Sequence, residues 1–305
     1  MATTLIIEQA LNGLQLGVML FLMAAGLTLV FGVMGVINLA HGSLYMTGAF
    51  TAAYTAPFVG FWLGLAAGAL AAATMGALVE RGVLRPLYAR DHLDQVLATF
   101  ALILVFSEGA RMVSGGRPLW LEIPEALAGH VDLPGGTPYP AYRLVIIAMG
   151  LTVALLLWVL IRQTRLGMRI RAGQSDREMI SALGVDIGRL STAIFALGAG
   201  LAGLAGAMVG ALQSVEVGMG EPVLILAFVT IVIGGIGSIR GAFVGALLVG
   251  FVDTLGRAGL PALVRLIAPA TEATAIGAGL ASVTIYLLMA VVLALRPRGL
   301  FPADG

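Results

Sequence analysis

The sequence contains no lysine and no cysteine, and each absence excludes a class of protein. All 17 basic residues are arginine. A P-loop ATPase needs a lysine to reach the nucleotide phosphates, and a Schiff-base enzyme needs one as its nucleophile, so we expect neither activity in this chain. Because there is no cysteine, the chain cannot form a disulfide, a thiol nucleophile or a thiolate metal site.

Charged residues of either sign are also scarce. They make up 11% of the 305 residues, whereas a soluble domain has about 25%. Hydrophobic residues make up 59%, and no acidic or basic residue occurs between Gln9 and Val79. A membrane helix needs about 20 apolar residues, so this stretch alone has room for about three spans. The net charge of +1 gives no basic surface for nucleic acid.

The apolar runs predict an all-α polytopic membrane protein of about eight or nine membrane segments, with glycine-broken or re-entrant helices. Met1–Ala10 lacks the cationic start and cleavage site of a signal peptide, so the first run is expected to remain as a span. The predicted segments are Leu11–Phe31, Ser43–Val59, Phe61–Val79, Val96–Val113, Leu144–Ile161, Leu190–Leu212, Val223–Ile239, Gly241–Val252 and Ala275–Leu295.

The arginines predict how these segments are oriented. They gather in one loop around Arg81–Arg90, in another around Arg162–Arg177, and at the end of the chain. Short cytoplasmic loops collect basic residues, so these three places should be cytoplasmic and the N-terminus external. We therefore expect one transmembrane domain over 1–305, with an external loop at 114–142, rich in proline and glycine, and a cytoplasmic loop at 164–188.

The cytoplasmic loop carries a short amphipathic helix in this prediction. Ser175 and Glu178 have the spacing of a capping box, and Gly184 marks a helix stop. Met179, Ile180 and Leu183 would share an apolar face. That face could enter a groove on a partner protein, or it could pack on the chain's own inner surface or on lipid.

Two glycine-rich breaks interrupt the membrane segments. Gly35–Ser43 holds polar residues, among them Asn38 and His41, inside the charge-free stretch, and polar groups at that depth are often functional. His41 could equally be a hydrogen-bonded structural group. Gly234–Ser238 does not have the GxGxxG pattern of a nucleotide loop, so its glycines indicate a broken helix with close backbone packing. The similar spacing of Gly35/Gly42 and Gly234/Gly241 is that of an internal repeat, but it could also arise by chance.

Three runs together resemble a known family. GLTLVFGVMGVINLAHGSLYMTGAF at Gly26–Phe50 is similar to the amino-terminal signature of branched-chain amino acid ABC permeases of the LivH type. AFVTIVIGGIGSIRGAFVGALLVG at Ala227–Gly250 and the ending RPRGLF at Arg296–Phe301 also resemble that family. The segment Arg171–Val185 matches the place of the family's coupling region, although it lacks the literal EAA motif.

The resemblance implies a subunit of an importer for leucine, isoleucine and valine in the bacterial inner membrane. Its partners would be a second permease, identical or homologous, two cytoplasmic ATPases that use the ATP, a periplasmic solute-binding protein, and membrane lipid, but no nucleic acid. The loop at 114–142 would be periplasmic. The chain itself would hold no cofactor, no metal and no catalytic residue. The predicted solute-pathway residues are Asn38, His41, Gly42, Ser43, Gly234, Gly235, Gly237 and Ser238. The predicted ATPase-coupling residues are Arg171, Ser175, Asp176, Glu178, Met179, Ile180, Leu183 and Gly184.

Alternatives to this assignment remain open at the level of sequence. A permease of the same family could carry urea, short amides, small acids or a sugar, because selectivity can rest with the binding protein. An intramembrane enzyme or redox subunit would need clustered His, Asp or Glu, and His92 and His130 lie far from His41 in the chain. A lone channel would not need the capped cytoplasmic helix.

Overall fold

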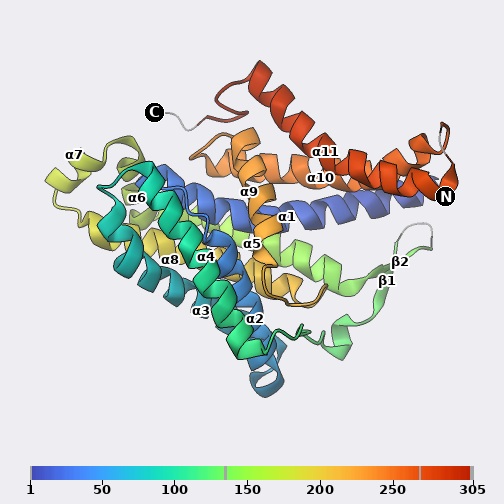
Figure 1. The fold of residues 1–305 in the computed structure, drawn as a ribbon, viewed down its shortest axis with the longest axis horizontal. Coiled ribbons are helices and arrows are strands. Elements are labelled where there is room, and N and C mark those ends of the chain that lie inside the picture. Colours follow the sequence, from blue (N-terminus) through green and yellow to red (C-terminus); the bar gives the residue numbers. More distant parts are fainter. Residues whose placement is uncertain (1, 134–135, 268, 303–305) are drawn as a thin grey trace.

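The computed structural model describes residues 2–133, 136–267 and 269–302. The chain is helical, and its only strands in that part form a short hairpin (Figure 1). The long helices are α1 (Ala2–Met34), α2 (His41–Val59), α3 (Phe61–Val79), α4 (His92–Ser114), α5 (Ala141–Gln163), α8 (Ile187–Val209), α9 (Gly220–Gly234), α10 (Ile239–Val264) and α11 (Ala270–Leu295). The shorter elements are η1 (Glu80–Leu84, a π-helix), η2 (Arg85–Leu87), η3 (Glu125–Leu127), β1 (His130–Asp132), β2 (Pro138–Pro140), α6 (Arg165–Ser175) and α7 (Arg177–Ala182).

Each predicted membrane segment corresponds to one long helix, which confirms the fold class. Seven helices in the described part are long and apolar enough to cross a membrane, and α9 is a shorter apolar helix. The chain is therefore a multi-pass membrane protein. The predicted end of the eighth segment at Val252 was wrong, because α10 continues to Val264. Asp253 and Arg257 pair at 2.8 Å one turn apart, so their charges are compensated on the helix itself.

Glycines allow the central helices to approach one another closely. Helix α1 lies between α10 and α5 (Figure 1), and α8 packs against α1, α2 and α3. A Cβ on Gly250 would lie 2.5 Å from the carbonyl oxygen of Gly13, and a Cβ on Gly48 would overlap the backbone of Gly203. Small residues at helix contacts are typical of membrane bundles, where close packing replaces the hydrophobic effect as the driving force.

The two ends of the molecule carry different elements. At one end, the Asn12 side chain near the start of α1 accepts hydrogen bonds from the Tyr139 hydroxyl at 3.1 Å and from Arg143 at 2.6 Å. These residues adjoin the β1–β2 hairpin, which pairs His130 with Pro140. At the other end, Phe301 donates its N–H to Gly234 at 2.8 Å. Helices α6 and α7 lie at this second end, where α6 contacts α1 and α7 contacts α6 and α8 (Figure 1).

The glycine contacts give a prediction for stability. Gly48→Ala should lower the free energy of unfolding by about 1–3 kcal/mol, because the new methyl group overlaps backbone that cannot move aside as a side chain would. Gly109→Ala on α4 is the matched control, since its Cβ would meet nothing within 4 Å. Thermal unfolding of the detergent-solubilised protein compares the two. Equal midpoints for both variants would contradict the packing argument.

Candidate functional site

The first glycine-rich break buries polar side chains in the middle of the bundle. Helix α1 ends at Met34, and Gly35 takes a positive φ of 68°, which glycine adopts without strain. The chain then turns back into the bundle, where the Asn38 side-chain oxygen accepts a hydrogen bond from the Ala40 N–H at 3.0 Å. Asn38 and His41 are both fully buried. The first break therefore places polar groups at membrane depth inside protein, as such breaks must.

Several of these buried polar atoms have no partner in the described part of the chain. They include the Asn38 amide nitrogen, both ring nitrogens of His41 and the Tyr45 hydroxyl. The His41 ring lies against Gly26 of α1, where a Cβ would approach Nε2 to 2.9 Å, and the backbone of Met23 adjoins it without hydrogen-bond geometry. Buried polar atoms are nearly always satisfied, so a group of unsatisfied ones is a candidate for binding a ligand.

The second break is filled by the chain's own C-terminal segment. The N–H groups of Leu300 and Phe301 donate to the carbonyls of Ile233 and Gly234, at 2.9 and 2.8 Å. A Cβ on Gly235 would lie 2.5 Å from the Phe301 carbonyl oxygen. The Ser238 hydroxyl caps α10 by accepting from the Gly241 N–H at 3.1 Å. These contacts use the glycines for packing and the serine for capping.

The structure does not bring the two predicted halves of the pathway together. Gly42 packs against Gly220 at the start of α9, where a Cβ would lie 2.7 Å from the Gly220 carbonyl oxygen, whereas Gly234 is the last residue of α9. A helix of 15 residues is about 20 Å long. Asn38, His41, Gly42 and Ser43 therefore form one group, and Gly234, Gly235, Gly237 and Ser238 form another at the far end of α9.

The short helix of the 164–188 loop exists, but its cap differs from the prediction. Asp176, and not Ser175, is the N-cap of α7, and its carboxylate accepts from the Met179 N–H at 2.8 Å. The capping-box prediction was wrong because a preceding helix, α6, continues through Ser175 and leaves Asp176 as the residue with extended backbone. Glu178, in the first turn of α7, is exposed. Gly184 ends the helix with a φ of 87°, as predicted.

The apolar side chains at α7 do not share the one face that was predicted, because one is buried and two are exposed. Ile180 is 5% exposed and anchors the helix to the protein, whereas Met179 and Leu183 are 59% and 77% exposed. The predicted common face is therefore split into one buried anchor and two apolar side chains that face outward. Arg171 lies on α6, where its guanidinium donates to the Ile161 carbonyl at the end of α5.

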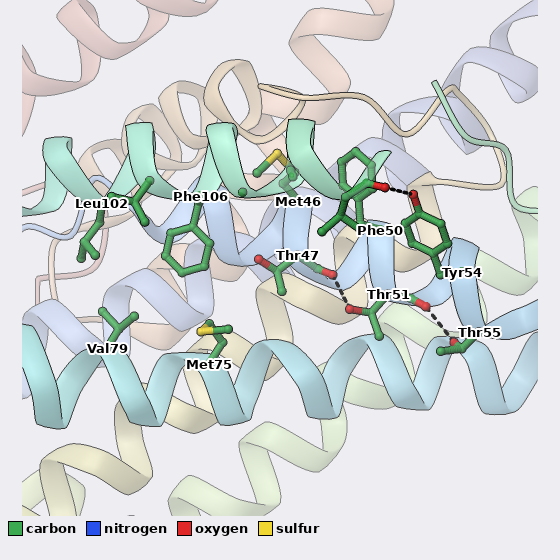
Figure 2. Close-up of a pocket in the computed structure, with 14 residues that line it drawn as sticks. Met46, Thr47, Phe50, Thr51, Tyr54, Thr55, Met75, Val79, Leu102 and Phe106 are labelled. Carbon is green, nitrogen blue, oxygen red and sulfur yellow. Dashed lines mark hydrogen bonds between the residues drawn. The ribbon is translucent and has the colours of Figure 1, made fainter. Parts of the chain in front are cut away.

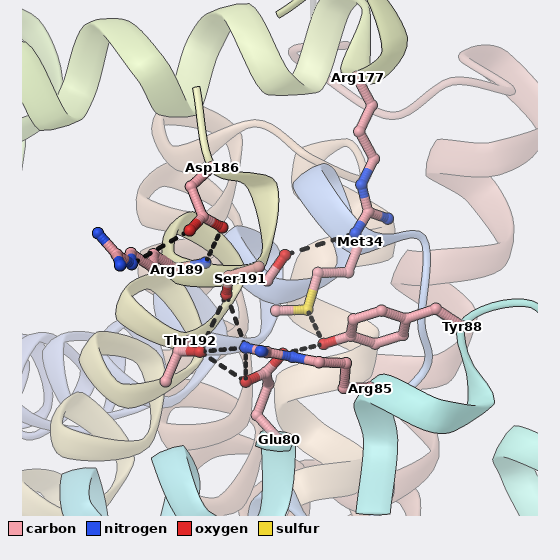
Figure 3. A network of polar contacts seen from close by, with 10 residues as sticks. Met34, Glu80, Arg85, Tyr88, Arg177, Asp186, Arg189, Ser191 and Thr192 are labelled. Carbon is pink, nitrogen blue, oxygen red and sulfur yellow. Dashed lines mark hydrogen bonds and ion pairs between the residues drawn. The ribbon is translucent and has the colours of Figure 1, made fainter. Parts of the chain in front are cut away.

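A buried ion pair under α7 was missed by the sequence analysis. Glu80, at the start of η1, is fully buried and receives Arg85 at 2.9 Å and the Thr192 hydroxyl at 2.7 Å (Figure 3). Arg85 also donates to the Gly188 carbonyl at 2.7 Å. The π-helix of η1 joins α3 to η2, which carries Arg85. The sequence shows Glu80 as the first acid after the charge-free stretch, with Arg85 five residues later, but it does not show their partners on α8.

The same network connects α7 with the first break. The Tyr88 hydroxyl donates to Glu80 at 2.9 Å, and the sulfur of Met34 lies 3.2 Å from that hydroxyl (Figure 3). Arg177 of α7 lies over the Tyr88 ring at 5.3 Å, a cation–π distance. Burial, and after it the charge of Glu80, raises the pKa of Tyr88, so its hydroxyl stays protonated and remains a donor. A continuous chain of contacts thus runs from α7 to the last residue of α1.

A separate apolar cavity of about 610 Å³ lies where α4 stands away from α2 and α3 (Figure 2). Thr47, Thr51 and Thr55 line it, but each hydroxyl donates to the carbonyl one turn earlier, at 2.7–2.8 Å. At one end the Tyr54 hydroxyl bonds the Val113 carbonyl at 3.1 Å (Figure 2). Because these polar groups are satisfied within the protein, the cavity suits an apolar occupant and not a zwitterion.

The buried ion pair gives a second prediction for stability. Arg85→Ala should lower the free energy of unfolding by about 2–3 kcal/mol, because it leaves the Glu80 carboxylate buried without its counter-ion. The value lies below that of a fully buried pair because the Arg85 side chain is 40% exposed. Arg111→Ala breaks an exposed pair with Glu108 and should cost about 0–1 kcal/mol. Thermal unfolding of both variants tests this, and similar losses would contradict a special role for Glu80.

Comparison with known proteins agrees with the resemblance found in the sequence. The chain is 29% identical to the high-affinity branched-chain amino acid transport system permease protein LivH of Escherichia coli K12, covering 83% of this chain and 86% of that protein. It is 29% identical to BraD of Pseudomonas aeruginosa, covering 96% and 95%. The ribose import permease protein RbsC of E. coli K12 is 28% identical, covering 76% and 72%.

A family model describes the same relationship over almost the whole chain. It matches residues 9–295 and is described as the branched-chain amino acid transport system permease component. The match includes both glycine-rich breaks, the network around Glu80 and the loop that carries α7. The chain therefore belongs to the family of branched-chain amino acid transport system permease components.

Proposed function

We propose that this chain is the permease subunit of an ABC importer that moves leucine, isoleucine and valine across the inner membrane. The main support for coupling to ATPases is the exposure of apolar side chains at α7, a short capped helix. Met179 and Leu183 face outward, while the buried Ile180 holds the helix to the protein. An apolar helix face of this size fits a groove on a partner. The ATP chemistry then belongs to two separate ATPase subunits, and the chain itself holds no cofactor.

In this proposal α7 lies on the cytoplasmic side and the β1–β2 hairpin on the periplasmic side. The arginines of the 164–188 loop support that orientation, because basic residues collect in cytoplasmic loops. The start of α1 adjoins the hairpin end, and Phe301 adjoins the α6–α7 end. The N-terminus would be periplasmic and the C-terminus cytoplasmic, with a solute-binding protein docking at the periplasmic end and a second permease completing the pathway.

Coupling would follow the contacts from α7 to the first break. ATPase closure would push α7, and Arg177 would pass the displacement to Tyr88 and the buried Glu80. Tyr88 also contacts Met34, after which α1 breaks. The buried Glu80 carboxylate accepts from Arg85, Tyr88 and Thr192, so this cluster resists deformation and would transmit the displacement instead of absorbing it.

The solute would meet the first break. Asn38 and His41 offer unsatisfied polar atoms. Gly42 and Ser43 lie at the start of α2, where the positive end of the helix dipole favours a carboxylate, although the Ser43 N–H itself already donates to the Ala40 carbonyl. An amino acid zwitterion needs such groups. Gly234 and Gly235 are already engaged with the C-terminal segment, Ser238 caps α10, and Gly237 lies against Gly32 of α1, so we assign the second break a packing role in this proposal.

The alternative is a permease of the same family for another small polar solute. The similarity to the ribose import permease RbsC favours a sugar as a rival to leucine, and urea and short amides remain rivals as well. Uptake into proteoliposomes containing this chain, its second permease, the ATPases and the binding protein distinguishes them. Leucine uptake that requires ATP supports the proposal, uptake of ribose or urea alone replaces the solute, and uptake without the ATPases overturns the mechanism.

Changing the outward face of α7 should uncouple the importer. The double variant Met179→Glu, Leu183→Glu should lower ATP-dependent leucine uptake by about tenfold or more and abolish co-purification of the ATPases, because it places charges in an apolar contact. Ser181→Glu, on the same helix and also exposed, is the matched control and should keep uptake within about twofold. Equal loss in both variants would show that the apolar face is not the contact.

The polar atoms of the first break give a prediction that separates binding from folding. Asn38→Leu and His41→Leu should each lower leucine uptake by about tenfold, the cost of a hydrogen bond to a charged group. Thermal stability should stay the same or rise in His41→Leu, which removes ring nitrogens that lack partners, whereas Asn38→Leu also removes the acceptor of the Ala40 N–H and should cost about 1–3 kcal/mol. Thr99→Val, which removes a buried hydroxyl already bonded to Val96, serves as control and should keep uptake. A loss of stability with normal uptake would assign these residues to structure alone.

A further inference from the structure

An apolar groove runs along α1 between α5 and α10. Leu151, Leu155 and Trp158 are exposed on α5, and their spacing of four and three residues places them on one face together with Arg162. On α10, Phe243 and Val244 follow Arg240 at spacings of three and four and share its face. Each apolar stripe therefore ends in an arginine, and the two arginines lie at the same end of the molecule.

Aromatic side chains form the floor of the groove. Phe21 of α1 packs edge to face with Phe243 at 5.1 Å between ring centroids. The groove has a volume of about 460 Å³, and Arg240 is the only charged residue among those that line it. An apolar groove with this lining suits a hydrocarbon chain.

The groove opens into a second, polar cavity of about 620 Å³ at the α6–α7 end. The two cavities share Ile239, Arg240 and Phe301. Arg162, Arg171 and Arg240 line the polar cavity. Among the residues that the structure describes, no acidic side chain lines it, and none of the three arginines forms an ion pair. The N-terminus of α10, capped by Ser238, opens into the same space and adds its positive dipole end.

We propose that this pair of cavities is a binding site for one anionic phospholipid of the surrounding bilayer. The phosphate group lies among Arg162, Arg171 and Arg240, and one acyl chain lies in the groove over Phe21. Trp158 sits one turn from Arg162, at the depth where an indole ring marks the border between hydrocarbon and headgroup. A free phosphate would use the arginines but not the apolar groove.

The charges argue against a second copy of the chain as the occupant. A two-fold interface centred here would be isologous and would bring the same arginines face to face. Like charges opposed across an interface are costly. The lipid site rests only on the chain being in a membrane, so it stands or falls independently of the proposed solute and of the coupling by α7.

Native mass spectrometry of the permease in a mild detergent tests the proposal. The protein is titrated with phosphatidylglycerol, with phosphatidylcholine of the same acyl chains, and with inorganic phosphate. We expect the wild-type protein to bind one phosphatidylglycerol tightly. The triple variant Arg162→Ala, Arg171→Ala, Arg240→Ala should bind this lipid about 100-fold more weakly, because each arginine near the headgroup contributes about fivefold in affinity. The triple control Arg90→Ala, Arg169→Ala, Arg265→Ala removes equal charge from exposed positions outside the site and should bind as the wild type does.

A second pair of variants tests the groove. Val244→Trp fills it and should weaken phosphatidylglycerol while leaving inorganic phosphate unchanged, whereas Val283→Trp on an exposed face of α11 should change neither. If the triple variant fails to fold, Arg240→Gln alone replaces it, with an expected loss of about fivefold. Equal binding of the two lipids, equal losses in the control, or phosphate binding as tight as that of the lipid would overturn the proposal. A dimer abolished by Val244→Trp but insensitive to lipid would assign the groove to a second copy.

Discussion

Contact between glycine backbones of neighbouring helices is the constraint on which the rest of this structure depends. The pairs Gly48/Gly203 and Gly42/Gly220 bring α2 against α8 and α9 closely enough that no side chain fits between them. Lipid tails are as apolar as the helices, so only such close packing and internal hydrogen bonds favour the assembled bundle. The space left beside Gly26 is occupied by the ring of His41. Burial of the first break is therefore a consequence of the glycine packing around it.

The two glycine-rich breaks differ in whether their polar groups have hydrogen-bond partners within the protein. At the second break, backbone groups exposed by the end of α9 are satisfied by Leu300 and Phe301, although Gly237 and Ser238 also line the polar cavity of the proposed lipid site. At the first break the side chains of Asn38 and His41 keep polar atoms without partners. A solute path through a permease needs one part that stays polar and unsatisfied, because a polar solute there can make hydrogen bonds that the protein does not already make within itself.

The end of the molecule that carries α7 also carries its strongest electrostatic features. Glu80 is held by Arg85, Tyr88 and Thr192, and Arg177 of α7 stacks on Tyr88. Arg171 of α6 also lines the cavity of the proposed lipid site, together with Arg162 and Arg240. Helix α6 and the helix α7 that follows it therefore take part in both features.

The sequence by itself determined the class of the protein and the position of every long helix, because a span of about 20 apolar residues and the placement of arginine are local properties. It also marked both breaks and the stop at Gly184. Only the tertiary structure decided that Gly42 and Gly234 lie at opposite ends of α9, that Ile180 faces inward, and that Glu80 finds a partner on α8. Such facts depend on which helices become neighbours, and in a chain so rich in glycine and alanine many pairings satisfy the local pattern equally well.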